Sequence, residues 1–393
     1  MATTRNRNIY NQYDIRRYVD DNNFSVIMNT ANSKYNSLNS RSAQWRLLGD
    51  WDKPSDSKIW SQGHKTVPIM ARASILSTHA PKPMRNTSGW KFYTGSTPKM
   101  GHGYTMGEDD LFMLRDAKNN TGESMQTLIY DSLLTNATNI LGGIHNELTH
   151  MCLELASTSE IHEQSVDGAA YDFTFDFEQN QFLNVDPLWF AADGTPNENA
   201  TVIQDIIAMQ RTLTSTQNRN VNAWMLNVDT LYMILDHPSV LKAYLAWRSN
   251  GQTTTNANFI ATRTEVAAFM HDRGVWGFLP IDYKSVHEED GIAVEDTPAF
   301  SPYTMVAFNA NEKLFNIKCT NSIWKDRQQY GGIGANTMYS FVEDRIAVLS
   351  TWQENPIHNT VEFELYAGPV FKNLRDYGLA TVWSASDGSS SGS

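Results

Sequence analysis

Residues 61–107 read SQGHKTVPIMARASILSTHAPKPMRNTSGWKFYTGSTPKMGHGYTMG. The stretch is rich in Thr, Val, Ile, Phe and Tyr, is interrupted by Pro68, Pro81, Pro83 and Pro98, and shows little helical periodicity. A segment of this kind cannot build a core of its own. We therefore predict an extended β-hairpin or loop that lies on another surface, for which a neighbouring copy of the chain is the natural candidate.

The same stretch has no Asp or Glu and carries six cations, our candidate contacts between subunits: Lys65, Arg72, Lys82, Arg85, Lys91 and Lys99. Residues 1–107 hold 15 basic and 6 acidic side chains, whereas residues 108–393 hold 16 basic and 37 acidic ones. Opposite potentials steer copies of a chain together and set their register. The alternative is a basic patch on an ordinary enzyme. The acidic balance of 108–393 argues against tight nucleic-acid binding by that part.

The composition is that of a folded protein, since 41% of the 393 residues are hydrophobic and 11% are aromatic. The two cysteines, Cys152 and Cys319, lie far apart, which argues against a disulfide framework or a cysteine-based zinc site. Residues 1–17 lack the apolar segment of a signal peptide, and no run of about 18 apolar residues occurs. We expect a protein without a membrane partner that stays in a reducing cytoplasm or leaves it when the cell breaks.

Two periodic segments follow a polar N-terminal stretch. Residues 1–60 combine Asn, Ser, Arg and Asp with scattered aromatic residues, which favours an extended arm rather than a core. Alternation of aromatic and polar residues over 171–177 predicts a strand. Apolar residues at steps of three and four predict a long amphipathic helix over 122–157, with this stripe: Met125, Ile129, Leu133, Ile140, Ile144, Leu148, Met151 and Leu155.

The following residues, about 190 to 330, predict a mixed α/β unit. Thr195–Glu198 and Thr262–Glu265 have the capping-box pattern of a helix N-terminus, Pro238 should start a helix, and Gly274 should end one. We predict buried strands over 221–226, 275–279 and 304–308. Strand patterns return over 335–383, including the alternation at 361–366, and the Ser- and Gly-rich residues 384–393 predict a flexible tail.

Several residue patterns suggest a metal site or a catalytic site, but none of them has the spacing that such a site requires. His145 and His150 are five residues apart, so their rings lie on different helix faces, and the single Glu147–His150 pair lacks the second pair of a di-iron site. The acidic run 287–290 lacks calcium-loop spacing, and Asp172 with Asp176 belongs to the wet face of a strand. We therefore expect no catalytic residue, no cofactor, no metal and no enzymatic activity.

Glycines form a second group of candidate residues. Gly101, Gly103 and Gly107 resemble a phosphate loop, but the third glycine comes one place too late and no buried strand leads into it. Gly142 and Gly143 lie in the middle of the predicted helix, where they should bend or weaken it. We interpret all five as hinge candidates.

The order of these elements resembles the major capsid protein of tailed bacteriophages, with the Hong Kong 97 fold of the lambda-like branch. The resemblance covers about residues 60–383 and rests on segments spread along them: Thr97-Pro98-Lys99 through Gly107-Glu108, Leu128–Leu155, Tyr171-Asp172-Phe173, Trp189, Pro196, Asp205-Ile206, Trp224, and Gly368-Pro369 through Val382. It implies an α+β fold divided into an N-terminal arm (1–60), an extended β-hairpin loop (61–107), a spine helix with the first peripheral strands (108–190), an axial α/β domain (191–334), returning peripheral strands (335–383) and a tail (384–393).

The resemblance also implies a function. We expect a structural protein that self-assembles in the host cytoplasm into the icosahedral head shell of a virion, from hexamers and pentamers, and that encloses packaged DNA without sequence-specific binding. Scaffold, portal and decoration proteins are possible partners. Some members of the family cross-link a Lys to an Asn, and nothing in the spacing of Asn355 or Asn359 identifies such a pair. The alternatives are an encapsulin-like shell and a cytoplasmic enzyme.

Overall fold

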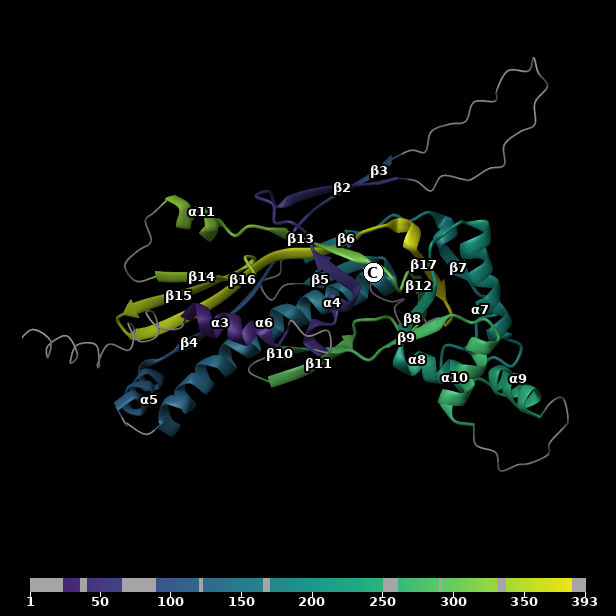
Figure 1. The fold of residues 1–393 in the computed structure, drawn as a ribbon, viewed down its shortest axis with the longest axis horizontal. Coiled ribbons are helices and arrows are strands. Elements are labelled where there is room, and N and C mark those ends of the chain that lie inside the picture. Colours follow the sequence, from purple (N-terminus) through teal and green to yellow (C-terminus); the bar gives the residue numbers. More distant parts are fainter. Residues whose placement is uncertain are drawn as a thin grey trace, which may run out of the picture. The chain divides into compact units, whose positions relative to one another are not determined.

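The computed structural model describes residues 24–35, 41–65, 90–119, 123–164, 170–249, 261–289, 292–330 and 337–383. The chain divides into two compact units (Figure 1). Unit 1 comprises Met1–Trp60, Gly95–Cys152 and Asn316–Val370, and unit 2 comprises Ser61–Thr94, Leu153–Phe315 and Phe371–Ser393. The chain therefore passes between the units several times. Among the described residues, no helix combines the length and the apolar character needed to cross a bilayer.

Unit 1 is built on a six-stranded sheet whose longest strand is β16 (Ile357–Phe371). The path β1 (Gly49–Trp51), β13 (Phe315–Thr320), β16, β15 (Ile346–Glu354) and β14 (Thr337–Val342) is joined by β4 (Lys99–Met106), which pairs antiparallel with β16. Apolar side chains alternate along the start of β16, as the sequence predicts for 361–366, and Val361, Phe363 and Leu365 are buried. The helices α5 (Glu108–Asn119) and α11 (Ile323–Tyr330) belong to the same unit.

The predicted long helix is confirmed as α6 (Glu123–Thr158), which runs without interruption through Gly142 and Gly143. Of the predicted stripe, Ile144, Leu148, Met151 and Leu155 are buried, and Ile140 is half-buried. The side chains of Met125, Ile129 and Leu133 lie outside the described residues. Near its C-terminal end the helix is buried on more than one face, since Cys152, Leu153 and Ala156 are also inaccessible.

The N-terminal segment differs from the expected extended arm. Within 24–51 the chain forms α3 (Phe24–Ser33), a short 3₁₀ turn (Arg41–Ala43) and α4 (Trp45–Leu48) before entering β1. Met28, Ala31, Ala43 and Trp45 are almost fully buried in unit 1. The expectation of an arm without a core was wrong for these residues, because small and polar side chains such as Ala31 and Asn32 are buried here by tertiary contacts that leave no periodic apolar pattern. Residues 1–23 and 36–40 lie outside the described part of the chain.

Unit 2 contains a five-stranded sheet in the order β7 (Phe182–Asn184), β17 (Tyr377–Thr381), β12 (Thr304–Phe308), β8 (Ala223–Asn227) and β9 (Gly277–Ile281). The strands predicted over 221–226, 275–279 and 304–308 correspond to β8, β9 and β12. The helices are α7 (Val202–Arg211), α8 (Val228–Leu235), α9 (Pro238–Arg248) and α10 (Arg263–Asp272), and a short π-helical turn (Thr212–Thr216) extends α7. Their buried side chains share a core with those of the sheet, including Trp189, Ile206, Trp224, Phe269 and Met305.

The helix-end signals in unit 2 had different outcomes. The capping box at Thr262 and Glu265 is present, Pro238 occupies the first turn of α9, and Gly274 follows α10 with a φ of +93°. The box predicted at Thr195 is wrong, because the Thr195 hydroxyl donates instead to Asp193 at 2.6 Å and α7 begins only at Val202. A short polar cluster can satisfy the same side chain within a turn.

Three two-stranded sheets complete the described fold. They are β2 (Ile59–Lys65) with β3 (Trp90–Ser96), β5 (Glu160–Gln164) with β6 (Ala170–Thr174), and β10 (Lys284–Glu289) with β11 (Ile292–Pro298). The strand predicted over 171–177 ends at Thr174, although Phe175 and Phe177 continue into the core of unit 2 against Phe371 and Tyr377. The acidic run 287–290 falls largely on the β10–β11 hairpin.

Candidate inter-subunit surface

The β2–β3 hairpin has one buried and one exposed face in its unit 2 portion. His64 on β2 and Tyr93 on β3 are buried, and their rings meet edge to face with centroids 5.5 Å apart. The Tyr93 ring also lies 5.0 Å from that of Phe175, and its hydroxyl donates to the Asp176 carbonyl at 2.7 Å. The Gln62 amide donates to the Phe371 carbonyl at 2.7 Å. The base of the hairpin is therefore anchored on its own chain.

The opposite face of the hairpin is apolar and open. Trp90 is 62% exposed and Phe92 is 69% exposed, and their rings stack with centroids 6.4 Å apart. Gly63 lies beneath this pair, and a Cβ there would come within 2.9 Å of the Phe92 ring. We call Trp90, Phe92 and Thr94, which share this side of β3, the outer face of the hairpin. Two large aromatic side chains this exposed are unusual on a solvated surface and are typical of interface anchors.

The six candidate cations divide into three groups. Lys91 lies on the inner face of β3 and forms an ion pair with Asp176 at 2.6 Å. Lys99 lies on β4 and pairs with Glu364 of unit 1 at 3.0 Å, with its ammonium 5.8 Å from the Tyr366 ring centroid. Lys65 ends β2, and its side chain is outside the description, as are residues Arg72, Lys82 and Arg85. The two described cations thus have partners within the chain, which the sequence did not indicate.

Several of the five glycine hinge candidates lie where another segment of the chain comes close to their backbone. A Cβ on Gly101 would overlap the Phe363 carbonyl oxygen of β16, and one on Gly103 would lie 3.0 Å from the Val361 carbonyl oxygen. Gly107 precedes α5 and donates its backbone N–H to Asp110 at 3.0 Å. A Cβ on Gly142 would lie 2.6 Å from the Tyr35 hydroxyl, whereas Gly143 has room, with His102 at 3.5 Å. At Gly101 and Gly142 a larger side chain would collide with the neighbouring segment, which explains why glycine stands there. The hinge role of all five glycines stays a prediction.

Two other candidate residues, His145 and Asn359, are buried and hydrogen-bonded within the protein. His145 is buried in unit 1 and bonded to Trp45 and Asn32, so its ring nitrogens are engaged by the protein. Asn359 is buried in β16 and donates to Ser350 at 2.9 Å, which leaves it inaccessible to a lysine within this conformation. Asn32, Trp45 and Glu343, which prove to organise the N-terminal segment, were missed because their partners lie about 100 to 300 residues away.

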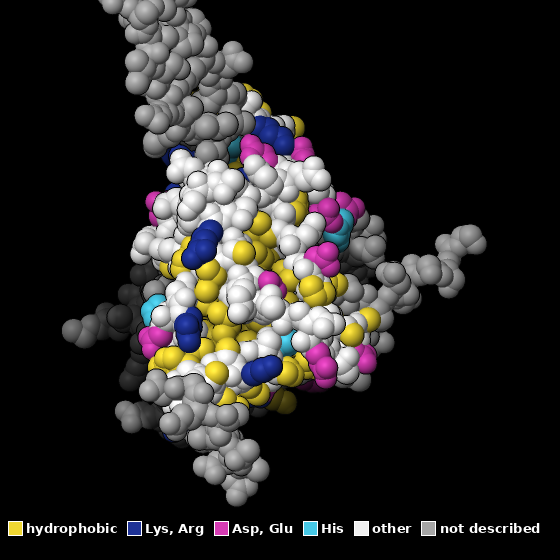
Figure 2. Space-filling model, turned by 90° about the vertical axis from the view of Figure 1, so that its right-hand side faces the viewer, with side chains coloured by type: hydrophobic (Ala, Val, Ile, Leu, Met, Phe, Trp, Pro, Cys, Tyr) yellow, Lys and Arg dark blue, Asp and Glu magenta, His cyan; other side chains and the backbone are white. Residues whose placement is uncertain are grey.

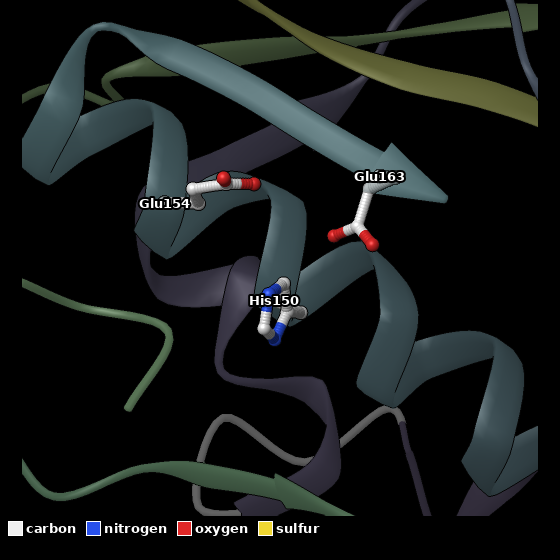
Figure 3. A group of neighbouring side chains, drawn as sticks. All are labelled: His150, Glu154 and Glu163. Carbon is white, nitrogen blue, oxygen red and sulfur yellow. The ribbon is translucent and has the colours of Figure 1, made fainter. Parts of the chain in front are cut away.

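A group of ligand-type side chains forms at the C-terminal part of α6. His150 and Glu154 lie one turn apart on that helix, and Glu163 comes from β5 (Figure 3). One ligand atom of each lies within 4.8 Å of the others. Burial raises the pKa of the Glu154 carboxyl above its usual value. All three side chains are half-buried, and Glu147, which the sequence pairs with His150, is not part of the group.

Apolar side chains also gather on the face formed by the helices of unit 2 at the right of Figure 1, as Figure 2 shows in yellow. Leu245 and Trp247 of α9 are large and about half exposed. An open depression of about 330 Å³ lies in the same unit, lined among others by Ile207, Arg211, Arg273 and Trp276. Its lining pairs no nucleophile with a general base, which is the arrangement that covalent catalysis requires.

Comparison with solved structures defines the class of fold. The chain is similar to the putative capsid protein of an E. coli CFT073 prophage, with a TM-score of 0.50 and 10% identity over 90% of this chain and 98% of that one. The expected α+β fold of the Hong Kong 97 capsid type is thereby confirmed. At this identity the likeness concerns the fold, and assignment to the lambda-like branch stays a prediction.

Other solved structures give weaker likenesses. A capsid chain of cyanophage A-1(L) gives a TM-score of 0.42 at 11% identity, over 87% of this chain and 92% of that one. A virus-like particle from Pyrococcus furiosus gives 0.40 at 7% identity, over 91% and 100%. No family model matches the sequence, and no curated protein matches it either.

Proposed function

We propose that this chain is a major capsid protein that self-assembles into the icosahedral head shell of a tailed phage and encloses the packaged genome. The capsid-type fold supports the class of protein. The observation that carries self-assembly is the outer face of the β2–β3 hairpin, where Trp90 and Phe92 are exposed although the other side of the hairpin is firmly attached to the chain.

In the proposed shell, another copy of the chain covers the outer face of the hairpin. Aromatic anchors dominate binding free energy at interfaces, and truncating one costs about 2 kcal/mol or more. Each copy in a closed shell repeats the same contact, so a modest loss per contact is multiplied in the whole particle. The acid-free stretch around residues 66–89 and the acidic remainder of the chain add an attraction that salt weakens.

The proposal extends to the hinge residues, the packaged DNA and the partner proteins. Hexamers and pentamers of one sequence need local backbone adjustments, for which Gly101, Gly103, Gly107, Gly142 and Gly143 are the candidates. DNA is held by enclosure, because residues 108–393 are too acidic to grip phosphates. The protein has a structural rather than a catalytic role, is assembled in the host cytoplasm, and acts with scaffold, portal or decoration proteins.

The experiment compares three versions of the full chain expressed in bacteria and viewed by electron microscopy after sizing. The wild-type chain should form closed shells, and a Trp90→Ser, Phe92→Ser double variant should give folded protein without shells. Thr94→Ala changes the same strand on the same face without removing an aromatic anchor, so its shells should be normal. Shells of normal size and yield from the double variant would refute the role of the outer face. A wild-type chain that stays a discrete monomer would refute the capsid function.

A further inference from the structure

Glu343 collects three hydrogen bonds from the N-terminal segment. It lies in the turn between β14 and β15, with a φ of +53°. Asn32 of α3 donates to Oε1 at 2.7 Å, Arg46 of α4 pairs with Oε1 at 2.7 Å, and the Trp51 indole of β1 donates to Oε2 at 2.8 Å. The elements α3, α4 and β1 therefore each contribute one donor to a single carboxylate.

His145 of α6 closes a second connection to the same segment. The Trp45 indole donates to His145 Nδ1 at 3.1 Å, so that nitrogen must carry a lone pair. The ring proton then lies on Nε2, which is 3.0 Å from Asn32 Oδ1, and the Asn32 amide donates in turn to Glu343. The relay from Trp45 through His145 and Asn32 to Glu343 has the correct donor and acceptor at every step only when the imidazole is neutral.

The groups facing His145 come from several elements of unit 1. Arg46 and Tyr35 belong to the N-terminal segment, Glu343 to the β14–β15 turn, and the Tyr35 ring lies 5.1 Å from the imidazole. Burial and the Arg46 charge lower the pKa of His145 to about 4, against the opposing effect of Glu343. For Glu343 itself, burial would raise the carboxyl pKa, but Arg46 and the hydrogen bonds from Asn32 and Trp51 bring it below its usual value.

We propose that residues 24–35 and 41–51 form an acid-released latch, held on unit 1 by neutral His145 and detached when that ring is protonated. A proton on Nδ1 turns the acceptor for Trp45 into a second donor facing an indole N–H, and within the described part of the chain no carboxylate is hydrogen-bonded to the buried cation. Release of the segment brings His145 into water. It thereby removes the contact between two donors and the cost of burying the imidazolium charge. The sheet strands β15 and β16 do not take part in the relay and stay folded. This device does not depend on the proposed capsid function.

The sign and size of the effect follow from linkage. A ring whose pKa is lowered in the closed state stabilises that state above its ordinary pKa and loses the contribution as the pH falls toward the closed-state value. For an ordinary value of 6.5 and a closed-state value of about 4, the open fraction rises roughly 60-fold between pH 7 and pH 4.5.

The test is hydrogen exchange of the full chain between pH 7 and pH 4.5, with each rate divided by its intrinsic rate. Peptides from 24–51 should lose protection about 60-fold, whereas peptides from β15 and β16 keep theirs. His145→Asn retains an acceptor near Trp45 and cannot titrate at position 145, so its protection in 24–51 should change far less with pH than that of the wild-type chain. His150→Asn, on the same helix, is the matched control and should behave as wild type.

Three results would overturn the latch. These are unchanged protection of 24–51 in the wild-type chain at pH 4.5, equal loss in β15 and β16, and a normal acid response in His145→Asn. If His145→Asn does not fold, the wild-type comparison of 24–51 with β15 and β16 still decides the question.

Discussion

Tyr35 packs directly against Gly142 within unit 1. The Tyr35 hydroxyl donates to the Thr138 carbonyl at 2.7 Å, and a Cβ on Gly142 would lie 2.6 Å from the same hydroxyl oxygen. The glycine is thus one of the points on α6 at which the N-terminal segment approaches the helix closely. A position that looks like a weak place in the helix is a packing site.

This contact makes opposite predictions for two adjacent glycines. Gly142→Ala should lower the free energy of unfolding by about 1–3 kcal/mol, because the added methyl group collides with the Tyr35 hydroxyl. Gly143→Ala, which has room, should raise it by about 0.5–1 kcal/mol through helix propensity. Urea denaturation of the unassembled chain measures both.

The double variant Gly142→Ala, Tyr35→Phe provides the check, because removal of the hydroxyl leaves the Tyr35 ring carbon at 3.2 Å as the nearest atom and should restore part of the loss. Stabilisation by Gly142→Ala alone would show that the glycine is present for flexibility rather than for packing.

The ion pairs of Lys91 and Lys99 should differ in their effect on stability. Lys99→Met leaves the Glu364 carboxylate, whose side chain is 11% exposed, with the Ser322 hydroxyl as its remaining donor in the described structure, and should cost about 1–3 kcal/mol. Lys91→Met removes a pair whose Asp176 partner is largely solvated and should cost less than about 1 kcal/mol. Denaturant midpoints of the two variants test this order, and equal losses would contradict it.

His162 should titrate well above the ordinary range. Its Nε2 lies 3.0 Å from Glu160 and its Nδ1 lies 2.9 Å from Asp172, and these hydrogen bonds raise the pKa of His162 to about 9. A raised pKa means that the stabilisation is complete below the unfolded value of 6.5 and is lost as the pH rises through about 9. Solvent screening of this exposed ring keeps the contribution below about 1 kcal/mol.

An NMR titration of His162 measures this value directly. Asp172→Asn should move the midpoint down, because it replaces a charged acceptor by a neutral one. A wild-type midpoint near 6.5 would show that the two carboxylates do not engage the ring in solution.

Assembly should depend on charge in the acid-free stretch. Reversal of Lys82 and Arg85 to Glu should impair shell formation at low salt, and the difference from wild type should shrink near 1 M salt, where the Debye length is about 3 Å. Light scattering during assembly measures the rates. Lys91 is a poor choice for this test, because Lys91→Glu would also break its pair with Asp176. Equal assembly of the reversed and wild-type chains at low salt would show that the uneven charge is incidental.

Much of the fold could be predicted because its signals are local. The α6 stripe persists over many turns, and the strands β8 and β12 are short apolar runs buried on both faces. The residues behind the capsid resemblance also come together: the Trp189 indole donates to Asp205 at 2.9 Å, and Trp189 shares a core with Ile206 and Trp224.

The remaining features depend on partners distant in sequence. Asn32 meets Glu343 across 311 residues, so no window of sequence can show that the N-terminal segment is packed. Lys91 and Lys99 look like free cations in a basic stretch, yet each finds a carboxylate in another part of the chain. The exposure of Trp90 and Phe92 could be anticipated only in part, since alternation along β3 predicts two faces but not which one the chain itself covers.

The central claim is that a second copy of the chain covers the outer face of the β2–β3 hairpin in a closed shell. The most direct measurement is a cryo-electron microscopy reconstruction of the particles formed by the wild-type chain. The account predicts an icosahedral shell in which Trp90 and Phe92 are buried against a neighbouring subunit. A monodisperse monomer, or a shell in which both aromatic side chains still face solvent, would contradict it.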